Sequence, residues 1–138
     1  MSKSVKPPHA AQLLGAALGE LRASFPSDDW EGLRPSHFRI LEAIEGGAVR
    51  TVDLAAELGM TKQGAGQHVA YLTDGGFVTQ QPDPGDRRAR RVELTERGVE
   101  TLGRLHRRLA AIERAWIRQV GREDYATFRR VLTSIVDS

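Results

Sequence analysis

One long amphipathic stretch in the C-terminal half most constrains what this chain can fold into. Apolar residues recur there at steps of three and four, at Val99, Leu102, Leu105, Leu109, Ile112, Trp116 and Val120. This spacing predicts one helix of about 25 residues, roughly 38 Å long. A chain of 138 residues has the size of one domain, and such a helix exceeds the breadth of so small a domain. Something outside its own domain must therefore cover part of its apolar face.

Further helices are predicted on both sides of this stretch. Apolar spacing and the residues that start and stop helices place them at about 9–25, from Pro35 to Gly46, from Thr51 to Gly59, from Thr61 to about Asp74, and after Gly121. Thr51, Thr61 and Thr95 are expected to cap the helices that they precede. Residues 1–8 predict a loose arm, Pro26 a helix stop and residues 27–32 a loop.

Between the fourth helix and the long helix, the apolar pattern changes from helical spacing to alternation. The runs Phe77–Gln81 and Arg90–Leu94 fit two short strands. Pro82–Ala89 lies between them and is rich in Pro and Gly, which predicts a turn. The fold class is therefore mainly α with one small β-hairpin, whose tip is charged.

The third and fourth helices fit a helix-turn-helix. Ala55 and Ala56 are small enough to let the second helix approach, and Gly59 suits the corner between the helices. In this motif the second helix presents its N-terminal residues to the major groove of DNA. The residues of the second helix that we expect to reach DNA are Thr61, Lys62, Gln63 and Gln67.

The positive charge of the chain lies beside this helix. The net charge is +2, and residues 61–91 account for it, since the rest of the chain is neutral. The charged residues of the hairpin tip are Asp83, Asp86, Arg87, Arg88, Arg90 and Arg91. An arginine-tipped hairpin beside a helix-turn-helix can enter the adjoining minor groove, whose negative potential favours Arg. The alternative is a solvated tip without a ligand.

Residues Asp83–Gly98, DPGDRRARRVELTERG, closely resemble the wing motif of the MarR family of bacterial winged-helix regulators. The residues that match the motif are Asp86, Arg88, Leu94, Thr95 and Gly98. Asp53–Val78 resembles the helix-turn-helix of the same family. The resemblance is strong over about 33–98, and in the flanking helices it concerns their order and length more than their residues.

The resemblance implies a single MarR-like domain over residues 1–138. It comprises a winged helix-turn-helix lobe at about 33–98 and dimerisation helices at about 9–25 and 95–136. Such proteins are cytoplasmic homodimers that bind a pseudo-palindromic operator in double-stranded DNA and regulate transcription, with half-sites about 34 Å apart. The implied function is a ligand-responsive repressor whose effector binds between the dimer helices and the DNA-binding lobe. The sequence does not identify that effector.

The resemblance also implies roles for individual residues. Arg88 matches the family's wing arginine and is expected in the minor groove, whereas Arg87 and Arg90 are expected to contact phosphates. Asp86 would be repelled by DNA, so we expect it to hold a wing arginine in place. Tyr71 is a weaker candidate for a phosphate contact.

Base recognition is expected from the start of the fourth helix. Gln can form a forked contact with adenine, and Lys can contact guanine. This helix departs from the family pattern because it contains Gly64 and Gly66. Each glycine costs about 1 kcal/mol relative to Ala in a helix. Either the backbone approaches DNA unusually closely there, or the helix is loose until it binds.

Other classes of protein fit the sequence less well. The absence of cysteine excludes disulfides and thiolate metal sites, and the histidines lack a metal-ligand spacing. We expect no metal, no cofactor and no enzymatic activity, because no catalytic motif is present. No stretch approaches the ~20 apolar residues of a membrane span. The apolar run Ala10–Gly19 contains Gln12 and ends in charged residues, so we do not expect a secretion signal.

Two other interpretations stay open. The chain could be a winged-helix module that binds an acidic protein partner instead of DNA. A small enzyme that uses His37 or His68 would need a catalytic partner, and the sequence offers none. Trp30 and Trp116 are expected in the core or in dimer contacts, with a ligand cleft as the alternative.

Overall fold

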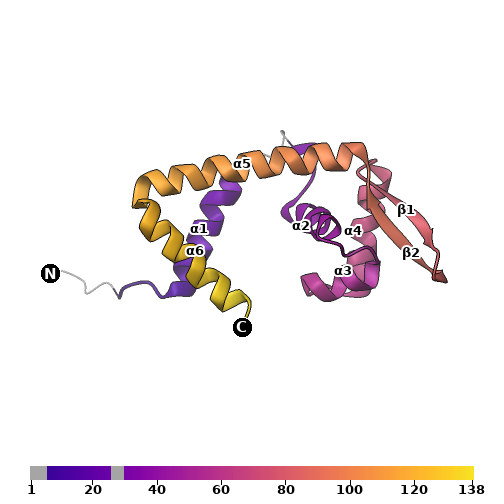
Figure 1. Ribbon diagram of the computed structural model, residues 1–138, viewed down its shortest axis with the longest axis horizontal. Coiled ribbons are helices and arrows are strands. Elements are labelled where there is room, and N and C mark those ends of the chain that lie inside the picture. The colour runs from indigo at the N-terminus through magenta and orange to yellow at the C-terminus, as the bar shows by residue number, and fades with distance from the viewer. Residues whose placement is uncertain (1–5, 26–29) are drawn as a thin grey trace.

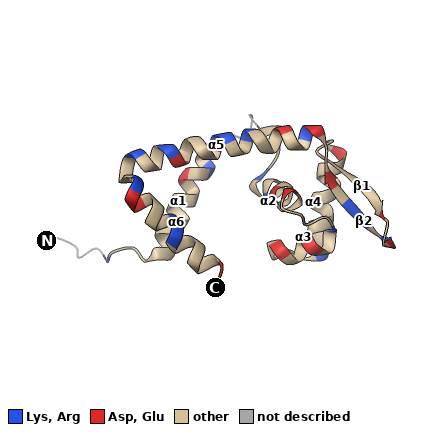
Figure 2. Ribbon diagram, in the orientation of Figure 1, with Lys and Arg blue, Asp and Glu red and all other residues tan. Residues whose placement is uncertain are grey.

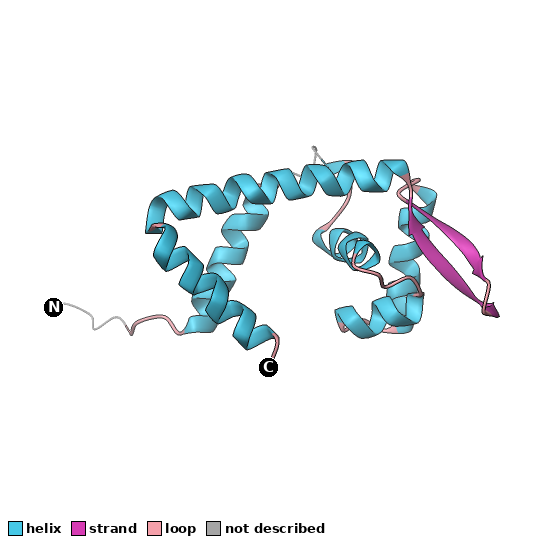
Figure 3. Ribbon diagram, viewed as in Figure 1, coloured by secondary structure: helices cyan, strands magenta, loops and turns pink. Residues whose placement is uncertain are grey.

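The computed structural model describes residues 6–25 and 30–138. The elements follow in the order α1 (Ala10–Ala23), α2 (Pro35–Glu45), α3 (Thr51–Leu58), α4 (Lys62–Asp74), β1 (Val78–Asp83), β2 (Asp86–Leu94), α5 (Glu96–Val120) and α6 (Arg122–Val136). The fold is mainly helical with one antiparallel hairpin, as the sequence predicted (Figure 3). Residues 1–5 of the predicted arm, the Pro26 stop and residues 27–29 of the predicted loop lie outside the described residues.

The long helix α5 runs along one side of the molecule and joins its two ends (Figure 1). The lobe formed by α2, α3, α4 and the hairpin lies at the N-terminal end of α5, whereas α1 and α6 lie at its C-terminal end. The lobe packs with the start of α5 around one core, whose largest fully buried side chains are Ile40, Leu41, Leu54, Val69, Leu72, Val78, Val92 and, from α5, Leu102. By contrast, α1 contributes no buried residue.

Local signals place most helix ends correctly. Gly59 ends α3 in the left-handed conformation, with φ of 63°. The hydroxyl oxygens of Thr61 and Thr95 accept hydrogen bonds from the N–H groups of Gly64 (2.9 Å) and Gly98 (3.1 Å), so both predicted caps are confirmed.

The predicted cap at Thr51 is wrong. Thr51 is the first helical residue of α3, and Arg50 precedes it in an extended conformation without a side-chain cap. The reason is that the chain before α3 pairs with the hairpin. The carbonyl of Val49 accepts a hydrogen bond from Val92 N–H at 2.7 Å, and Arg50 forms a β-bridge with Arg91.

The hairpin is longer than the sequence predicted. The turn expected at Pro82–Ala89 is confined to Pro84 and Gly85, because the strands extend to Asp83 and from Asp86. Pro82 fits in β1 because, in the described part of the chain, this strand pairs with β2 on one side only. Asp83 then folds the tip, since its Oδ1 accepts a hydrogen bond from Gly85 N–H at 2.8 Å.

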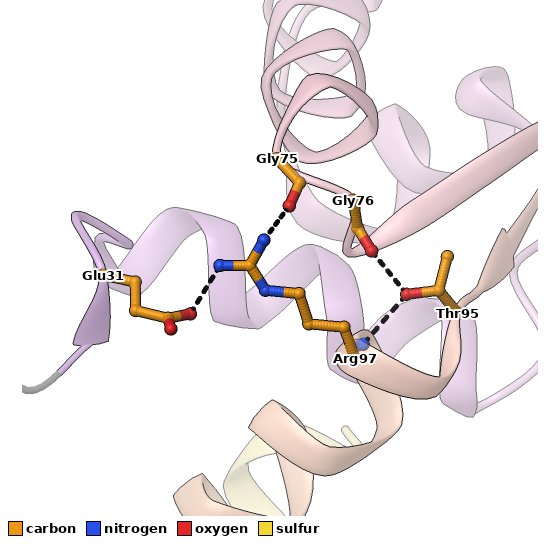
Figure 4. A network of polar contacts seen from close by, with 6 residues as sticks. Glu31, Gly75, Gly76, Thr95 and Arg97 are labelled. Carbon is orange, nitrogen blue, oxygen red and sulfur yellow. Dashed lines mark hydrogen bonds and ion pairs between the residues drawn. The ribbon is translucent and has the colours of Figure 1, made fainter.

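Thr95 joins the base of the hairpin to the start of α5 (Figure 4). Its hydroxyl donates to the carbonyl of Gly76 at 2.6 Å, in addition to capping α5. Its N–H donates to the carbonyl of Phe77 at 3.0 Å. The Leu-Thr-x-x-Gly part of the wing motif is therefore a joint between α4, the hairpin and α5.

Arg97 strengthens the same joint from the other side (Figure 4). Its guanidinium donates to the carbonyl of Gly75 and pairs with the Glu31 carboxylate at 2.9 Å. It also lies over the Phe77 ring, 4.2 Å from the centroid. The first turn of α5 is thereby tied to the end of α4 and to the segment before β1.

The other end of α5 turns at Gly121, as predicted, with φ of 92°. The Tyr125 hydroxyl of α6 then donates to Glu113 of α5 at 2.6 Å. Burial and the neighbouring Glu113 carboxylate raise the pKa of Tyr125 to about 12.

Within residues 6–25 and 30–138, no helix combines the length and apolar character that a membrane crossing requires.

Candidate nucleic-acid interface

The predicted reading helix α4 buries one face and exposes the other. Ala65, Val69 and Leu72 pack into the lobe. Gln63 and Gln67 are exposed and lie one turn apart, because residues four apart share a face of a helix. Thr61 and Lys62 are exposed at the start of the helix, so each predicted α4 contact residue is accessible.

The wing presents its charged residues on the two faces of β2. Side chains alternate along a strand, so Asp86, Arg88 and Arg90 share one face and Arg87 lies on the other. All four residues are exposed. Figure 2 shows the basic residues of β2 beside the helices of the lobe.

A groove of about 490 Å³ separates the wing from the start of α3 and α4. Its lining residues are Arg50, Thr51, Val52, Lys62, Gln80, Asp86, Arg88, Ala89 and Arg90. Four of them are cations and one is a carboxylate, so the groove favours an anion. The predicted residues Lys62, Asp86, Arg88 and Arg90 are brought together here, whereas Thr61, Gln63, Gln67 and Arg87 do not line the groove.

Arg50 was missed by sequence reasoning. Its Nη2 lies 2.6 Å from Oδ2 of Asp83, and the Asp83 side chain is only 8% exposed. The N–H of Gly85 and then the Arg50 guanidinium hold the pKa of Asp83 below its usual range, although burial opposes them. The Asp-Pro-Gly sequence at Asp83 indicates a turn at the hairpin tip. It does not indicate that Asp83 pairs with Arg50, which is distant in sequence.

The side chain of Asp86 contacts the main chain of the wing. Its Oδ1 accepts a hydrogen bond from the N–H of Arg88 at 3.0 Å. The ion pair at the tip belongs to Asp83 instead. The role of Asp86 in ordering the wing stays a prediction, with this hydrogen bond as its physical basis.

Three rings, those of His37, His68 and Tyr71, join α2 to α4. The His37 ring stacks on Tyr71 with centroids 4.6 Å apart, and its edge contact with His68 is 5.1 Å. Nδ1 of His37 accepts a hydrogen bond from Arg34 N–H at 2.9 Å. Burial, then the positive charges that His68 and Arg34 can carry, lower the pKa of His37. Tyr71 is therefore engaged by α2, although its side chain is partly exposed.

The two glycines of α4 differ in their surroundings. A Cβ at Gly64 would lie 3.0 Å from the capping hydroxyl of Thr61. A Cβ at Gly66 would meet open space. Proximity to the cap favours glycine at position 64, and nothing in the structure explains glycine at position 66.

Comparisons with known proteins agree with this architecture. The model of the MarR family matches residues 31–89. The HTH-type transcriptional regulator PetP of Rhodobacter capsulatus is 32% identical over 103 residues, which make up 74% of this chain and 62% of PetP. The chain thus spans less than two thirds of that relative's length.

Solved structures share the fold over almost the whole chain. The reduced form of MarR from E. coli has a TM-score of 0.80 at 17% identity and covers 95% of this chain and 98% of its own. PcaV from Streptomyces coelicolor, in complex with its natural ligand, has a TM-score of 0.75 at 17% identity, with coverage of 100% and 99%. Tm0710 from Thermotoga maritima is 26% identical, with a TM-score of 0.61 and coverage of 92% and 91%.

The lobe, with its helix-turn-helix and hairpin, defines a winged helix-turn-helix protein. The MarR family model thus matches the winged helix-turn-helix lobe over residues 31–89, and solved MarR structures share the fold over almost the whole chain.

Proposed function

We propose that this protein is a sequence-specific DNA-binding regulator of transcription that acts as a homodimer and responds to a small ligand. The observation that carries the proposal is the cationic groove beside the exposed face of α4. A reading helix flanked by a basic wing suits duplex DNA, because the helix fits the major groove and arginines suit the minor groove.

Each exposed group has a role in this proposal. Gln63 and Gln67 read base edges, and Lys62 contacts guanine or a phosphate. Arg88 enters the minor groove, while Arg87 and Arg90 hold phosphates. The Thr61 hydroxyl oxygen accepts the helix-cap bond, and its proton remains available for a phosphate.

The homodimer is supported by apolar side chains that the chain itself leaves uncovered. The exposed large apolar residues of α1 and α6 are Leu13, Leu14, Leu18, Phe128, Val131, Ile135 and Val136. An apolar surface of this kind marks an interaction site in a protein that folds in water. We propose that residues 9–25 and 95–136 dimerise and that residues 33–98 bind DNA.

Ligand response is supported by a cavity of about 550 Å³ between α1, α2 and α5. Phe25, Trp30 and Phe38 line it as touching rings, with centroids 5.3 and 5.1 Å apart. Arg22 and Arg39 add two positive charges and Glu42 one negative charge, so the lining is positive on balance. These residues suit a small aromatic anion. Because the cavity lies between the lobe and α1, a ligand that prefers one lobe position shifts the population toward it.

Selection of random duplexes on the purified protein, at two salt concentrations, tests DNA recognition. We expect an enriched palindrome with half-sites about one helical turn apart. Arg88→Ala should weaken binding to all sequences and reduce the salt dependence by about one phosphate contact. Arg130→Ala, an exposed arginine of α6, is the matched control.

Binding without an enriched motif, and without an effect of Arg88→Ala, would contradict the proposal. It would favour an acidic protein partner for the arginines. In the enzymatic interpretation His37 or His68 would act; the His37 ring is stacked on Tyr71 and its Nδ1 accepts a main-chain N–H, which favours a structural role for His37.

A further inference from the structure

The ion pair between Arg50 and Asp83 joins the wing to the start of α3. Asp83 is the last residue of β1, and Arg50 directly precedes α3. Among the ion pairs of the described residues, this one alone links the hairpin to the helices. It lies beside the groove that Arg88 and Arg90 line.

Asp83 holds two parts of the molecule with one carboxylate. Oδ1 accepts the Gly85 N–H at 2.8 Å and so folds the tip. Oδ2 lies 2.6 Å from the Arg50 guanidinium. The strand register shifts between Pro82 and Asp83, so the regular ladder is interrupted at this point. A side chain therefore fixes the tip where the main chain no longer does so.

The base of the wing has a different anchor. The Val92 N–H donates to the carbonyl of Val49 at 2.7 Å, and Arg91 bridges to Arg50. Arg88 and Arg90 lie beyond that anchor, toward the tip. Their position relative to α4 therefore depends on how the outer half of the hairpin is held.

We propose that Arg50 and Asp83 are positioning residues, which hold the wing at the spacing from α4 that DNA requires. This inference rests on the proposed DNA-binding function. Arg50 also lines the groove, but its charge is already paired with a buried carboxylate. Its main effect on DNA binding therefore acts through Arg88 and Arg90.

Asp83→Asn separates positioning from simple charge. The amide keeps an oxygen for the Gly85 N–H and loses the anion that pairs with Arg50. If only charge mattered, removing a carboxylate near DNA would strengthen binding. Positioning predicts the opposite, a loss of affinity on the order of tenfold, as expected for a coupled contact pair.

Two further measurements show where the loss arises. Hydroxyl-radical footprinting of the Asp83→Asn complex should lose protection in the minor groove at the wing and keep protection around α4. In the Arg88→Ala background, Asp83→Asn should have a much smaller effect, because the contact that it positions is already gone. Arg50→Ala should behave like Asp83→Asn, and Arg50→Lys should restore part of the affinity.

Asp74→Asn is the matched control, because Asp74 is an exposed carboxylate at the end of α4. It should leave affinity unchanged or raise it slightly. Thermal unfolding of Asp83→Asn should show that the lobe stays folded at the binding temperature.

The outcomes separate this inference from the function on which it rests. If Asp83→Asn binds as tightly as the parent with an intact wing footprint, while Arg88→Ala still weakens binding, the inference is wrong and the function stands. Arg50→Ala can also be made in the parent and in the Asp83→Asn variant. If it weakens DNA binding by the same factor in both, Arg50 contacts DNA directly and the inference is wrong. If the parent protein selects no duplex, the proposed function itself fails.

Discussion

A Cβ atom at position 98 would overlap the main-chain carbonyl oxygen of Phe77. Gly98 therefore lets the first turn of α5 pack directly on the segment that joins α4 to β1. The same carbonyl accepts a hydrogen bond from Thr95 N–H at 3.0 Å. The glycine of the wing motif is thus required by close packing of main chain on main chain.

Gly98→Ala should destabilise the protein. The new methyl group forces α5 away from Phe77, and overpacking of this kind costs about 1–3 kcal/mol, more than the gain in helix propensity. The free energy of unfolding, measured with urea, checks this. Gly103→Ala in the same helix is the control, because its Cβ would lie 3.4 Å from the flexible guanidinium of Arg107. Equal stability of the Gly98→Ala variant and the parent would contradict the packing argument.

Gly66→Ala should stabilise the protein, in contrast to Gly98→Ala. The added Cβ meets open space, and Ala favours a helix over Gly by about 1 kcal/mol. We expect a higher melting temperature without DNA. Gly64→Ala is the comparison and should gain less, because its Cβ would lie 3.0 Å from the Thr61 hydroxyl. No gain from Gly66→Ala would mean that this glycine has a structural role that its neighbours do not explain.

Local patterns predicted most of the fold. Apolar spacing located the helices, and Thr61, Thr95 and Gly121 marked their ends, because caps and breaks depend on neighbouring residues. The prediction at Thr51 was wrong because a strand distant in sequence pairs with Arg50 and so sets where α3 begins.

The candidate site was predictable only in part. A basic tip beside a helix indicated Lys62, Arg88 and Arg90, and the structure places these residues around one groove. The pair of Arg50 with Asp83 needed the three-dimensional fold, since nothing near either residue specifies the other. The contact residues themselves stay predictions until DNA is bound.

Gln67→Ala should change specificity more than affinity. Its amide is exposed on the outward face of α4, one turn beyond Gln63. Loss of a forked base contact costs about 1–3 kcal/mol at one base pair and leaves phosphate contacts intact. Repeated duplex selection should relax the preference at one position of each half-site, with the salt dependence unchanged. A uniform loss at all sequences would assign Gln67 to the backbone instead.

Stability should fall as the pH drops below 6.5. The folded state lowers the pKa of His37 from its model-peptide value of 6.5, so in that range the unfolded chain binds a proton that the folded chain does not. The free energy of unfolding therefore decreases as the pH falls. The decrease levels off once the pH is below the pKa of His37 in the folded state. His37→Asn keeps an acceptor for the Arg34 N–H and should flatten the pH dependence of the melting temperature. If the pH dependence of the melting temperature is unchanged in His37→Asn, that dependence arises from groups other than His37.

Ile135→Glu should break the proposed dimer. Ile135 is 63% exposed on α6, so a monomer would tolerate the change, whereas a buried interface would not. Sedimentation should show a dimer for the parent and a shift toward monomer for the variant. Val52→Glu is the matched control, since Val52 is 52% exposed on α3, in the lobe and outside the proposed dimerisation segments. A parent that stays monomeric at high concentration would contradict the dimer.

Ligand binding in the aromatic cavity should change the fluorescence of Trp30. The chain has two tryptophans, so Trp116→Phe leaves Trp30, which lines the cavity, as the single reporter. Benzoate should alter its emission in a saturable way, and Arg22→Met should weaken benzoate binding by about tenfold, the loss of a charged hydrogen bond. Benzamide, which lacks the charge, is the control and should be insensitive to Arg22→Met. A response to benzamide equal to that to benzoate would show that the cavity takes aromatic rings without regard to charge.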